Sequence, residues 1–209
     1  MRVLAVGAHF DDVELGCGGT IARHTATGDD VTIYIVTNSG FTNYAQEVIR
    51  KPEIALEEGR MAAKILGVDN LICGDYPTND LKWNDDLARS IIKIIEENDI
   101  EIVYTHWSGD IHVDHQVVAR ATIAAARHVP RLLMYRSNYY ESDVLFAGRF
   151  YVDITSTLEQ KKRAIMAHES EYKRVGKKWL RFFENQNQND GQMIGVDFAE
   201  RFEILKYLK

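Results

Sequence analysis

Runs of apolar residues alternate with segments of helical periodicity through most of the chain. The first run, Val3 to Val6, is continuous, as expected for a strand buried on both faces of a parallel sheet. Further apolar and β-branched runs predict strands at residues 30–36, 70–73, 100–104 and 132–135. The intervening segments predict helices at residues 19–27, 52–66, 85–97 and 113–128.

This alternation predicts an α/β fold. Parallel strands need crossover connections, and right-handed crossovers place helices on both faces of the sheet. We therefore expect a doubly wound, mainly parallel sheet, with residues 1–209 forming a single domain. The last third departs from the alternation: residues 158–173 are predicted as an amphipathic helix, and the Asn- and Gln-rich residues 184–192 as a loop.

The composition and charge of the chain exclude several classes of protein. The 209 residues are 45% hydrophobic and 27% charged, which is typical of a soluble globular protein with a substantial core. The formal charge is −6 and no basic stripe is interleaved with aromatic residues, so we exclude nucleic acid as a partner. Cys17 and Cys73 have neither disulfide-framework nor metal spacing. We expect a cytoplasmic protein with no secretory signal and no membrane span.

Two polar clusters follow predicted strands. The first comes directly after residues 3–6 and contains His9, Asp11 and Asp12. The second comes after residues 100–104 and contains Asp110, His112, Asp114 and His115. Because ligands of open α/β sheets bind beyond the carboxyl ends of the strands, we expect the two clusters to converge at one edge of the sheet.

Their donor atoms suit zinc. A catalytic zinc site takes three protein ligands from imidazole and carboxylate groups and leaves one position open. His9 and Asp12 are three positions apart across a turn, and His115 at the start of a helix completes the set. Asp11 then remains as the general base for a zinc-activated water whose pKa is about 7, which is the chemistry of amide hydrolysis.

His112 is the second candidate for proton transfer. It lies one turn from His115, where it is predicted to protonate the leaving amine or to stabilise the oxyanion. Asp114 or Asp110 is predicted to fix the tautomer of its ring.

Three segments resemble a known family. Residues 8–20, Ala-His-Phe-Asp-Asp-Val-Glu-Leu-Gly-Cys-Gly-Gly-Thr, resemble the Ala-His-Pro-Asp-Asp-x-Glu signature of the LmbE-like or PIG-L family of zinc-dependent N-acetylglucosamine deacetylases. His112-Val113-Asp114-His115 resembles the second motif of this family, His-Pro-Asp-His. Residues 195–202 resemble its C-terminal Ala-Glu-x-Phe segment, so the resemblance runs nearly from end to end.

The resemblance implies a Rossmann-like fold, an N-acetylated sugar as the small-molecule substrate, and a homo-oligomer. It implies the same zinc ligands, His9, Asp12 and His115, and the same base, Asp11. It places His112 with Asp114 as the acid or oxyanion stabiliser. The narrowing from amide hydrolase to deacetylase comes from this resemblance alone.

The chain also departs from the family pattern. Phe10 and Val113 stand where the family usually has proline, which loosens the turns without removing a ligand. The substrate-binding arginine of the family is assigned to Arg50, which precedes Glu53 in a similar pattern. The late His-x-Ser-Gln pattern appears as residues 168–171, with glutamate in the last position.

Several alternatives stay open at this point. Either cluster alone could be a helix N-cap, although two matched clusters favour a metal site. Another divalent transition metal could replace zinc. The chain could instead be a zinc amidase for a different acyl or non-sugar amide, or a non-catalytic binding subunit. His24, His128 and His168 are predicted to be surface or packed histidines, and His106 is equally consistent with a pocket-lining and a structural role.

Overall fold

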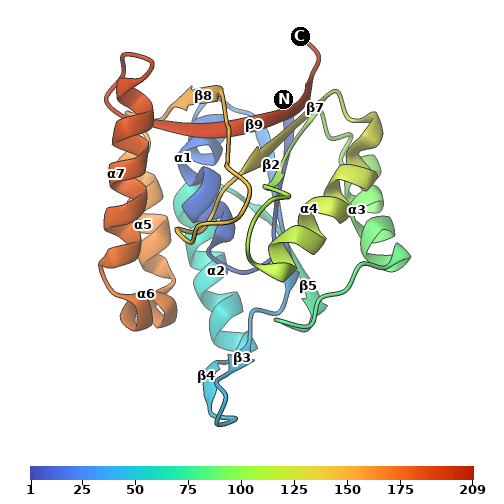
Figure 1. The fold of residues 1–209 in the computed structure, drawn as a ribbon. Helices are drawn as coiled ribbons and strands as arrows, with labels where there is room; N and C mark the ends of the chain where they lie inside the picture. Colours follow the sequence, from blue (N-terminus) through green and yellow to red (C-terminus); the bar gives the residue numbers. More distant parts are fainter.

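A seven-stranded sheet forms the centre of the computed structural model, which describes residues 1–209 (Figure 1). The strand order is β5-β2-β1-β6-β7-β9-β8, and only β9 and β8 run antiparallel to their neighbours. The strands of this sheet are β1 (Arg2–Gly7), β2 (Asp30–Thr37), β5 (Asn70–Tyr76), β6 (Ile102–His106), β7 (Arg131–Tyr135), β8 (Phe150–Asp153) and β9 (Ala199–Tyr207). The predicted mainly parallel α/β sheet is thus confirmed.

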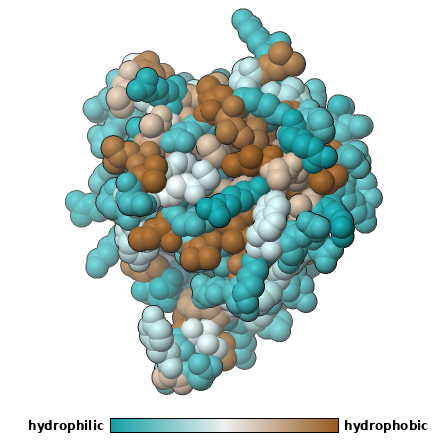
Figure 2. All heavy atoms as spheres, turned by 45° about the vertical axis from the view of Figure 1, so that its right-hand side comes forward, coloured by the Kyte–Doolittle hydropathy of each residue, from teal (hydrophilic) through white to brown (hydrophobic).

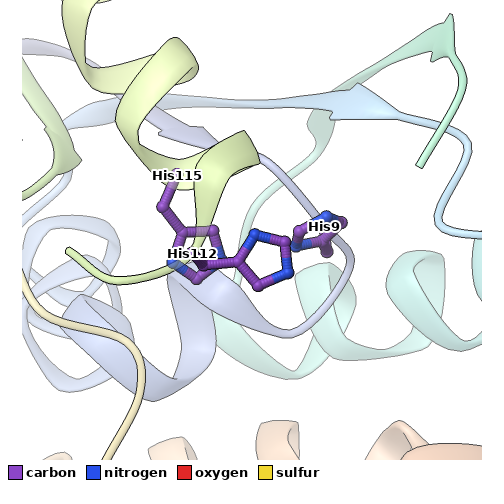
Figure 3. Close-up of side chains that lie close together, drawn as sticks. All are labelled: His9, His112 and His115. Atoms are coloured by element: carbon purple, nitrogen blue, oxygen red, sulfur yellow. The ribbon is translucent and has the colours of Figure 1, made fainter. Parts of the chain in front are cut away.

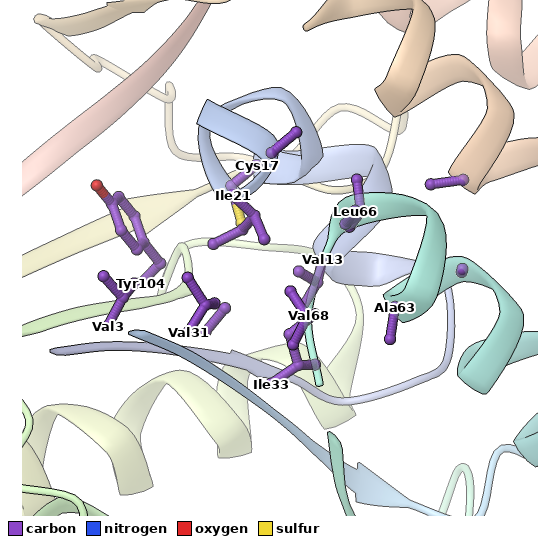
Figure 4. Packing of buried hydrophobic residues seen from close by; sticks show 14 of the residues in the cluster. Val3, Val13, Cys17, Ile21, Val31, Ile33, Ala63, Leu66, Val68 and Tyr104 are labelled. Atoms are coloured by element: carbon purple, nitrogen blue, oxygen red, sulfur yellow. The ribbon is translucent and has the colours of Figure 1, made fainter. Parts of the chain in front are cut away.

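Helices cover both faces of this sheet, as predicted (Figure 1). One apolar cluster joins the sheet to α1, α2 and α5, and Figure 4 shows its centre, where Val3 and Ile33 of the sheet face Val13 and Leu66. A second cluster joins the other face to α3 and α4. The helices are α1 (Asp12–Ala26), α2 (Pro52–Leu66), α3 (Asp85–Glu97), α4 (Val113–Ala125), α5 (Leu158–Ala167), α6 (Glu169–Val175) and α7 (Lys178–Gln192), with a short 3-10 turn η1 (Ala126–His128). None of these helices combines the length and the apolar character that crossing a membrane requires.

The C-terminal third differs most from the sequence prediction. The predicted loop at residues 184–192 was wrong: α7 continues through it to Gln192. Its inner face buries Phe183 and Asn187, and the Asn187 amide donates to the Ala199 carbonyl of β9 at 3.0 Å. A polar sequence therefore forms a packed helix, because its buried amide finds a partner on the neighbouring strand.

Two other predicted elements also differ from the structure. The predicted helix at residues 158–173 is divided at His168 into α5 and α6. The predicted loop after β2 contains a small hairpin of β3 (Phe41–Thr42) and β4 (Val48–Arg50), which projects from the lower end of the molecule (Figure 1).

Helix α1 begins at Asp12, seven residues before the predicted start, and it bends at Cys17, where φ is −145°. The bend frees polar backbone groups, and two buried side chains bond to them. Glu200 of β9 accepts hydrogen bonds from the backbone N–H groups of Gly19 (2.9 Å) and Thr20 (2.7 Å). The Lys161 ammonium donates to the Leu15 carbonyl at 2.9 Å and to Glu200 at 2.6 Å. We call this pair the α1 clamp; it satisfies backbone groups that would otherwise be buried without partners.

A candidate metal centre at the carboxyl ends of β1 and β6

A cavity of about 250 Å³ opens at the carboxyl ends of β1 and β6. β1 lies between β2 and β6, the position at which the strand order reverses and where doubly wound sheets bind their ligands. Both sequence motifs reach this cavity, as predicted. The predicted site residues that line it are His9, Asp11, Asp12, Arg50, His112 and His115.

Two histidines converge on the Asp12 carboxylate. His9 Nδ1 lies 3.3 Å from Asp12 Oδ2, and His115 Nε2 lies 3.2 Å from Asp12 Oδ1. All three residues come from the starts of helices: His9 precedes α1, Asp12 is its first residue, and His115 lies in the first turn of α4. The structure therefore brings the three predicted zinc ligands together.

The outer nitrogen of each ring faces a further carboxylate. His9 Nε2 lies 2.9 Å from Asp114 Oδ2, and His115 Nδ1 lies 3.2 Å from Asp110 Oδ2. In metal sites, such outer carboxylates fix the tautomer and the orientation of the ligating imidazole. The arrangement leaves His9 Nδ1 and His115 Nε2 directed at Asp12.

The electrostatics of the cluster favour a cation. Burial opposes the charged form of His9, but its bonds to Asp114 and Asp12 raise its pKa to about 9. Burial likewise opposes charge on His115, yet Asp12 and Asp110 raise its pKa to about 10. Binding of a divalent ion would displace these protons, because imidazole ligates in its neutral form.

The donor atoms fit a divalent transition metal. His9, His112 and His115 offer ring nitrogens that lie within 4.8 Å of one another, and Asp12, His106 and His115 form a second such group. Figure 3 shows the first group, in which the ring of His9 faces the start of α4. Imidazole nitrogen and carboxylate oxygen are ligands that zinc accepts. His9, Asp12 and His115 remain the predicted ligands, and they are drawn from both groups.

His106 lies behind Asp12 and does not line the cavity. Its Nε2 accepts the backbone N–H of Ala8 at 3.0 Å and lies 3.2 Å from Asp12 Oδ2. Ser137, which sequence reasoning did not identify, donates its hydroxyl proton to Asp12 Oδ1 at 2.9 Å. Ser137 follows β7, so the rule that located the two motifs at the ends of strands would also have indicated this position.

Asp11 lies beside Asp12 in an unusual backbone conformation. Its φ of 128° falls where residues other than glycine are rarely found, and such strain is concentrated at functional sites. Burial, together with the neighbouring charge of Asp12, raises the pKa of the Asp11 carboxyl to about 7. A carboxylate with that pKa accepts a proton readily near neutral pH, as a general base must.

Arg50 holds the backbone next to Asp11. One guanidinium nitrogen, Nη1, donates to the Phe10 carbonyl at 3.0 Å and lies 3.8 Å from the Asp11 carboxylate. The other, Nη2, donates to Glu58 at 2.9 Å, and Glu58 in turn accepts two bonds from Ser170, each 2.7 Å long. Arg50 is buried, so these contacts fix the strained peptide that carries Asp11.

We expect Arg50→Lys to lower kcat about tenfold with a smaller change in KM. Lysine cannot contact the Phe10 carbonyl and Glu58 at the same time, and small displacements of a catalytic group cost up to about a hundredfold in rate. Steady-state rates of acetate release measure both constants.

Arg174→Lys is the matched control, since Arg174 lines the same cavity but pairs with Glu171 and contacts neither Phe10 nor Asp11. We expect it to leave kcat within about twofold, because lysine keeps the charge that faces Glu171. A rise in KM at constant kcat for Arg50→Lys would instead support the predicted substrate-binding role.

The two carboxylates that were predicted to orient the His112 ring, Asp110 and Asp114, are arranged differently from the prediction. Neither Asp110 nor Asp114 contacts the His112 ring through its carboxylate; Asp114 contacts His9 and Asp110 contacts His115. The Asp114 backbone N–H donates to His112 Nδ1 at 3.2 Å. The neutral ring therefore carries its proton on Nε2. Burial, His115 and His9 lower the pKa of His112 to about 4, which keeps the ring neutral.

His168 is packed, as predicted, but its neighbours belong to this network. It is fully buried, with Nε2 3.4 Å from Glu14 and Nδ1 3.4 Å from the Arg50 guanidinium. Neither Glu14 nor His168 lines the cavity, so both lie behind its lining residues and would not contact a substrate.

Comparisons with known proteins agree with this fold and indicate a deacetylase family. The family model PIG-L, described as GlcNAc-PI de-N-acetylase, matches residues 4–126. The uncharacterized deacetylase YaiS of Escherichia coli (strain K12) is 36% identical over 143 residues, which are 65% of this chain and 73% of YaiS. Diacetylchitobiose deacetylase of Thermococcus kodakarensis is 27% identical over 223 residues, covering 95% of this chain and 81% of its own length.

A solved structure extends the similarity to the whole fold. The conserved protein TT1542 from Thermus thermophilus superposes with a TM-score of 0.83 at 27% identity, covering 99% of this chain and 95% of its own. The similarity thus includes the C-terminal third, which lies beyond the part that the family model matches.

Proposed function

We propose a specific reaction for this chain, which belongs to the PIG-L family of GlcNAc-PI de-N-acetylases. The reaction is zinc-dependent hydrolysis of the acetamido group of an N-acetylated amino sugar or of its conjugate. The observation that carries the proposal is the convergence of His9 and His115 on Asp12, with Asp11 buried in the same cavity. The relative that is named a diacetylchitobiose deacetylase supports an acetylated amino sugar as the substrate class.

His9, Asp12 and His115 would hold the ion. When bound, zinc supplies Lewis-acid activation of the attacking water and of the amide carbonyl. Asp11 accepts the proton that water loses as its oxygen attacks the carbonyl carbon. The Nε2–H of neutral His112 is free to donate a hydrogen bond to the carbonyl oxygen, where negative charge develops. As the C–N bond breaks, protonated Asp11 returns its proton to the leaving amine, which yields acetate and the free amino sugar.

Removal of the metal is expected to abolish this activity. Without a cation, neither the water nor the carbonyl is activated, so we expect acetate release from N-acetylglucosamine and its conjugates to fall at least about a hundredfold. The measurement compares freshly loaded protein, protein treated with a chelator, and chelated protein to which zinc is returned.

Recovery on addition of zinc separates loss of metal from loss of fold. Activity that survives chelation would contradict the metal role. Equal rates on simple acetanilide-type amides would favour the alternative of a general amidase, since such compounds lack the sugar.

A further inference from the structure

A second cavity of about 920 Å³ adjoins the catalytic one. It lies between the β3–β4 hairpin and the segment that follows β5, and we call it the hairpin groove. The hairpin forms the projection at the lower end of the molecule in Figures 1 and 2. Four residues line both cavities: Phe41, Arg50, Thr78 and Asn79. A ligand in the catalytic cavity can therefore continue into the groove.

The size of the catalytic cavity also points to a longer ligand. Its volume of about 250 Å³ is below the roughly 300–1,000 Å³ that is usual for small-molecule sites. The hairpin groove, at about 920 Å³, adds the missing space on one side. The catalytic cavity alone accommodates the acetamido end of a substrate better than a whole conjugate.

Two of the residues that line both cavities, Arg50 and Thr78, carry unpartnered polar atoms. Arg50 Nε and Thr78 Oγ1 are buried, and neither has a hydrogen-bond partner within the protein. Buried polar atoms are nearly always bonded, so Arg50 Nε–H can take an acceptor from outside the chain, either a water or a ligand. The Thr78 hydroxyl can both donate and accept. The two atoms suit hydroxyl and ether oxygens of a ligand that spans the two cavities.

The lining of the hairpin groove indicates the class of ligand. Among its thirteen residues Arg50 carries the only charge, and that charge is already opposed by Glu58 at 2.9 Å and by Asp11 at 3.8 Å. A phosphate or carboxylate would find no free cation there. Only three of the lining residues are hydrophobic, which disfavours a lipid chain.

What the groove does offer is amide and aromatic groups. The side-chain amides of Gln46 and Asn79 are available, whereas those of Asn38 and Asn43 bond Asp75 and Glu47 within the chain. The aromatic rings come from Phe41 and Tyr44. The Tyr44 side chain is fully exposed on the hairpin. Amides bond hydroxyl groups, and aromatic faces pack against the C–H faces of sugar rings.

We propose that the hairpin groove binds an uncharged sugar unit that is linked to the acetylated amino sugar in the catalytic cavity. The preferred substrates are then neutral oligosaccharides or glycosides, in place of free monosaccharides or nucleotide-linked sugars. This inference rests on the proposed deacetylase function and specifies which conjugate it acts on.

Binding of unreacted ligands tests the groove without turnover. Calorimetry on zinc-loaded Asp11→Asn protein compares N-acetylglucosamine, its β-1,4-linked disaccharide and its uridine diphosphate conjugate. We expect the disaccharide to bind about tenfold more tightly than the monosaccharide, which is what one or two neutral hydrogen bonds contribute. We expect the charged conjugate to gain nothing over the monosaccharide.

A variant in which a large side chain blocks the hairpin groove gives the decisive comparison with the wild-type protein. Thr42 lines the groove, and Thr42→Trp should remove the preference for the disaccharide, because the indole occupies the space for the second sugar. Ala45 lies on the same hairpin, is exposed and does not line the groove, so Ala45→Trp is the matched control and should keep the preference.

The outcomes separate the two proposals. Equal affinity for the mono- and disaccharide, tightest binding of the charged conjugate, or a preference that survives Thr42→Trp would each overturn the groove assignment. A preference that Thr42→Trp removes, combined with no acetate release from any of the sugars by the wild-type protein, would support the groove and contradict the proposed function.

Discussion

Asp11→Asn is expected to lower kcat for acetate release by about 10²–10⁴-fold, the usual contribution of a general base. The carboxamide has the shape of the carboxylate but cannot accept the proton that water loses. Asparagine also tolerates positive φ better than most residues, so the strained backbone at Asp11 should persist. Single-turnover rates of acetate release, with zinc content measured on the same sample, give the size of the effect.

Glu14→Gln is the matched control for this change. Glu14 is a buried carboxylate three residues along the same segment, but it contacts His168 and does not line the cavity. We expect it to retain most of the wild-type rate. If Asp11→Asn keeps more than about a tenth of the rate while zinc stays bound, Asp11 is not the base.

His115→Ala is expected to abolish stoichiometric zinc binding. Loss of a ligand should exceed the roughly 10–100-fold loss of affinity caused by removing an outer contact. The same change removes a positive charge that lies 3.2 Å from Asp12 in the metal-free protein, so that carboxylate becomes less well compensated. Competition with a chromophoric chelator measures the zinc affinity, and metal analysis of purified protein gives the stoichiometry.

His128→Ala provides the comparison, because His128 is an exposed histidine in η1 at the other end of α4. It should bind one equivalent of zinc with the wild-type affinity. Retention of one equivalent by His115→Ala would shift the assignment toward another ligand set, such as one that includes His112.

The sequence predicted the central sheet and the location of the site because both depend on local patterns. Continuous apolar runs such as Val3 to Val6 identify strands that are buried on both faces. His9 follows β1, and His115 lies at the start of the helix that follows β6. Both positions lie at the carboxyl edge of the sheet, which is why the sequence could predict that the two residues meet.

The features that were missed depend on tertiary contacts, which local patterns do not specify. The Asn- and Gln-rich end of α7 looks like a loop until the bond from Asn187 to Ala199 is known. The pairing of Asp114 with His9 spans 105 positions, and no spacing rule distinguishes it from a contact with His112. The hairpin groove is formed by loops, whose course short motifs do not determine.

The α1 clamp links the helix that carries Asp12 to residues near the C-terminal end of the chain. Formation of the metal centre should therefore depend on when those residues are synthesised. Gly19 and Glu200 are 181 positions apart, and contacts across such long separations form only after a costly loop has closed. A nascent chain that ends at residue 126 would contain His9, Asp12 and His115, yet both side chains of the clamp would still be missing. We therefore expect the bent form of the helix that begins with Asp12 to be stabilised only after the last strand has docked. Zinc loading is accordingly expected to be a late event, which follows the folding of the whole chain rather than nucleating it.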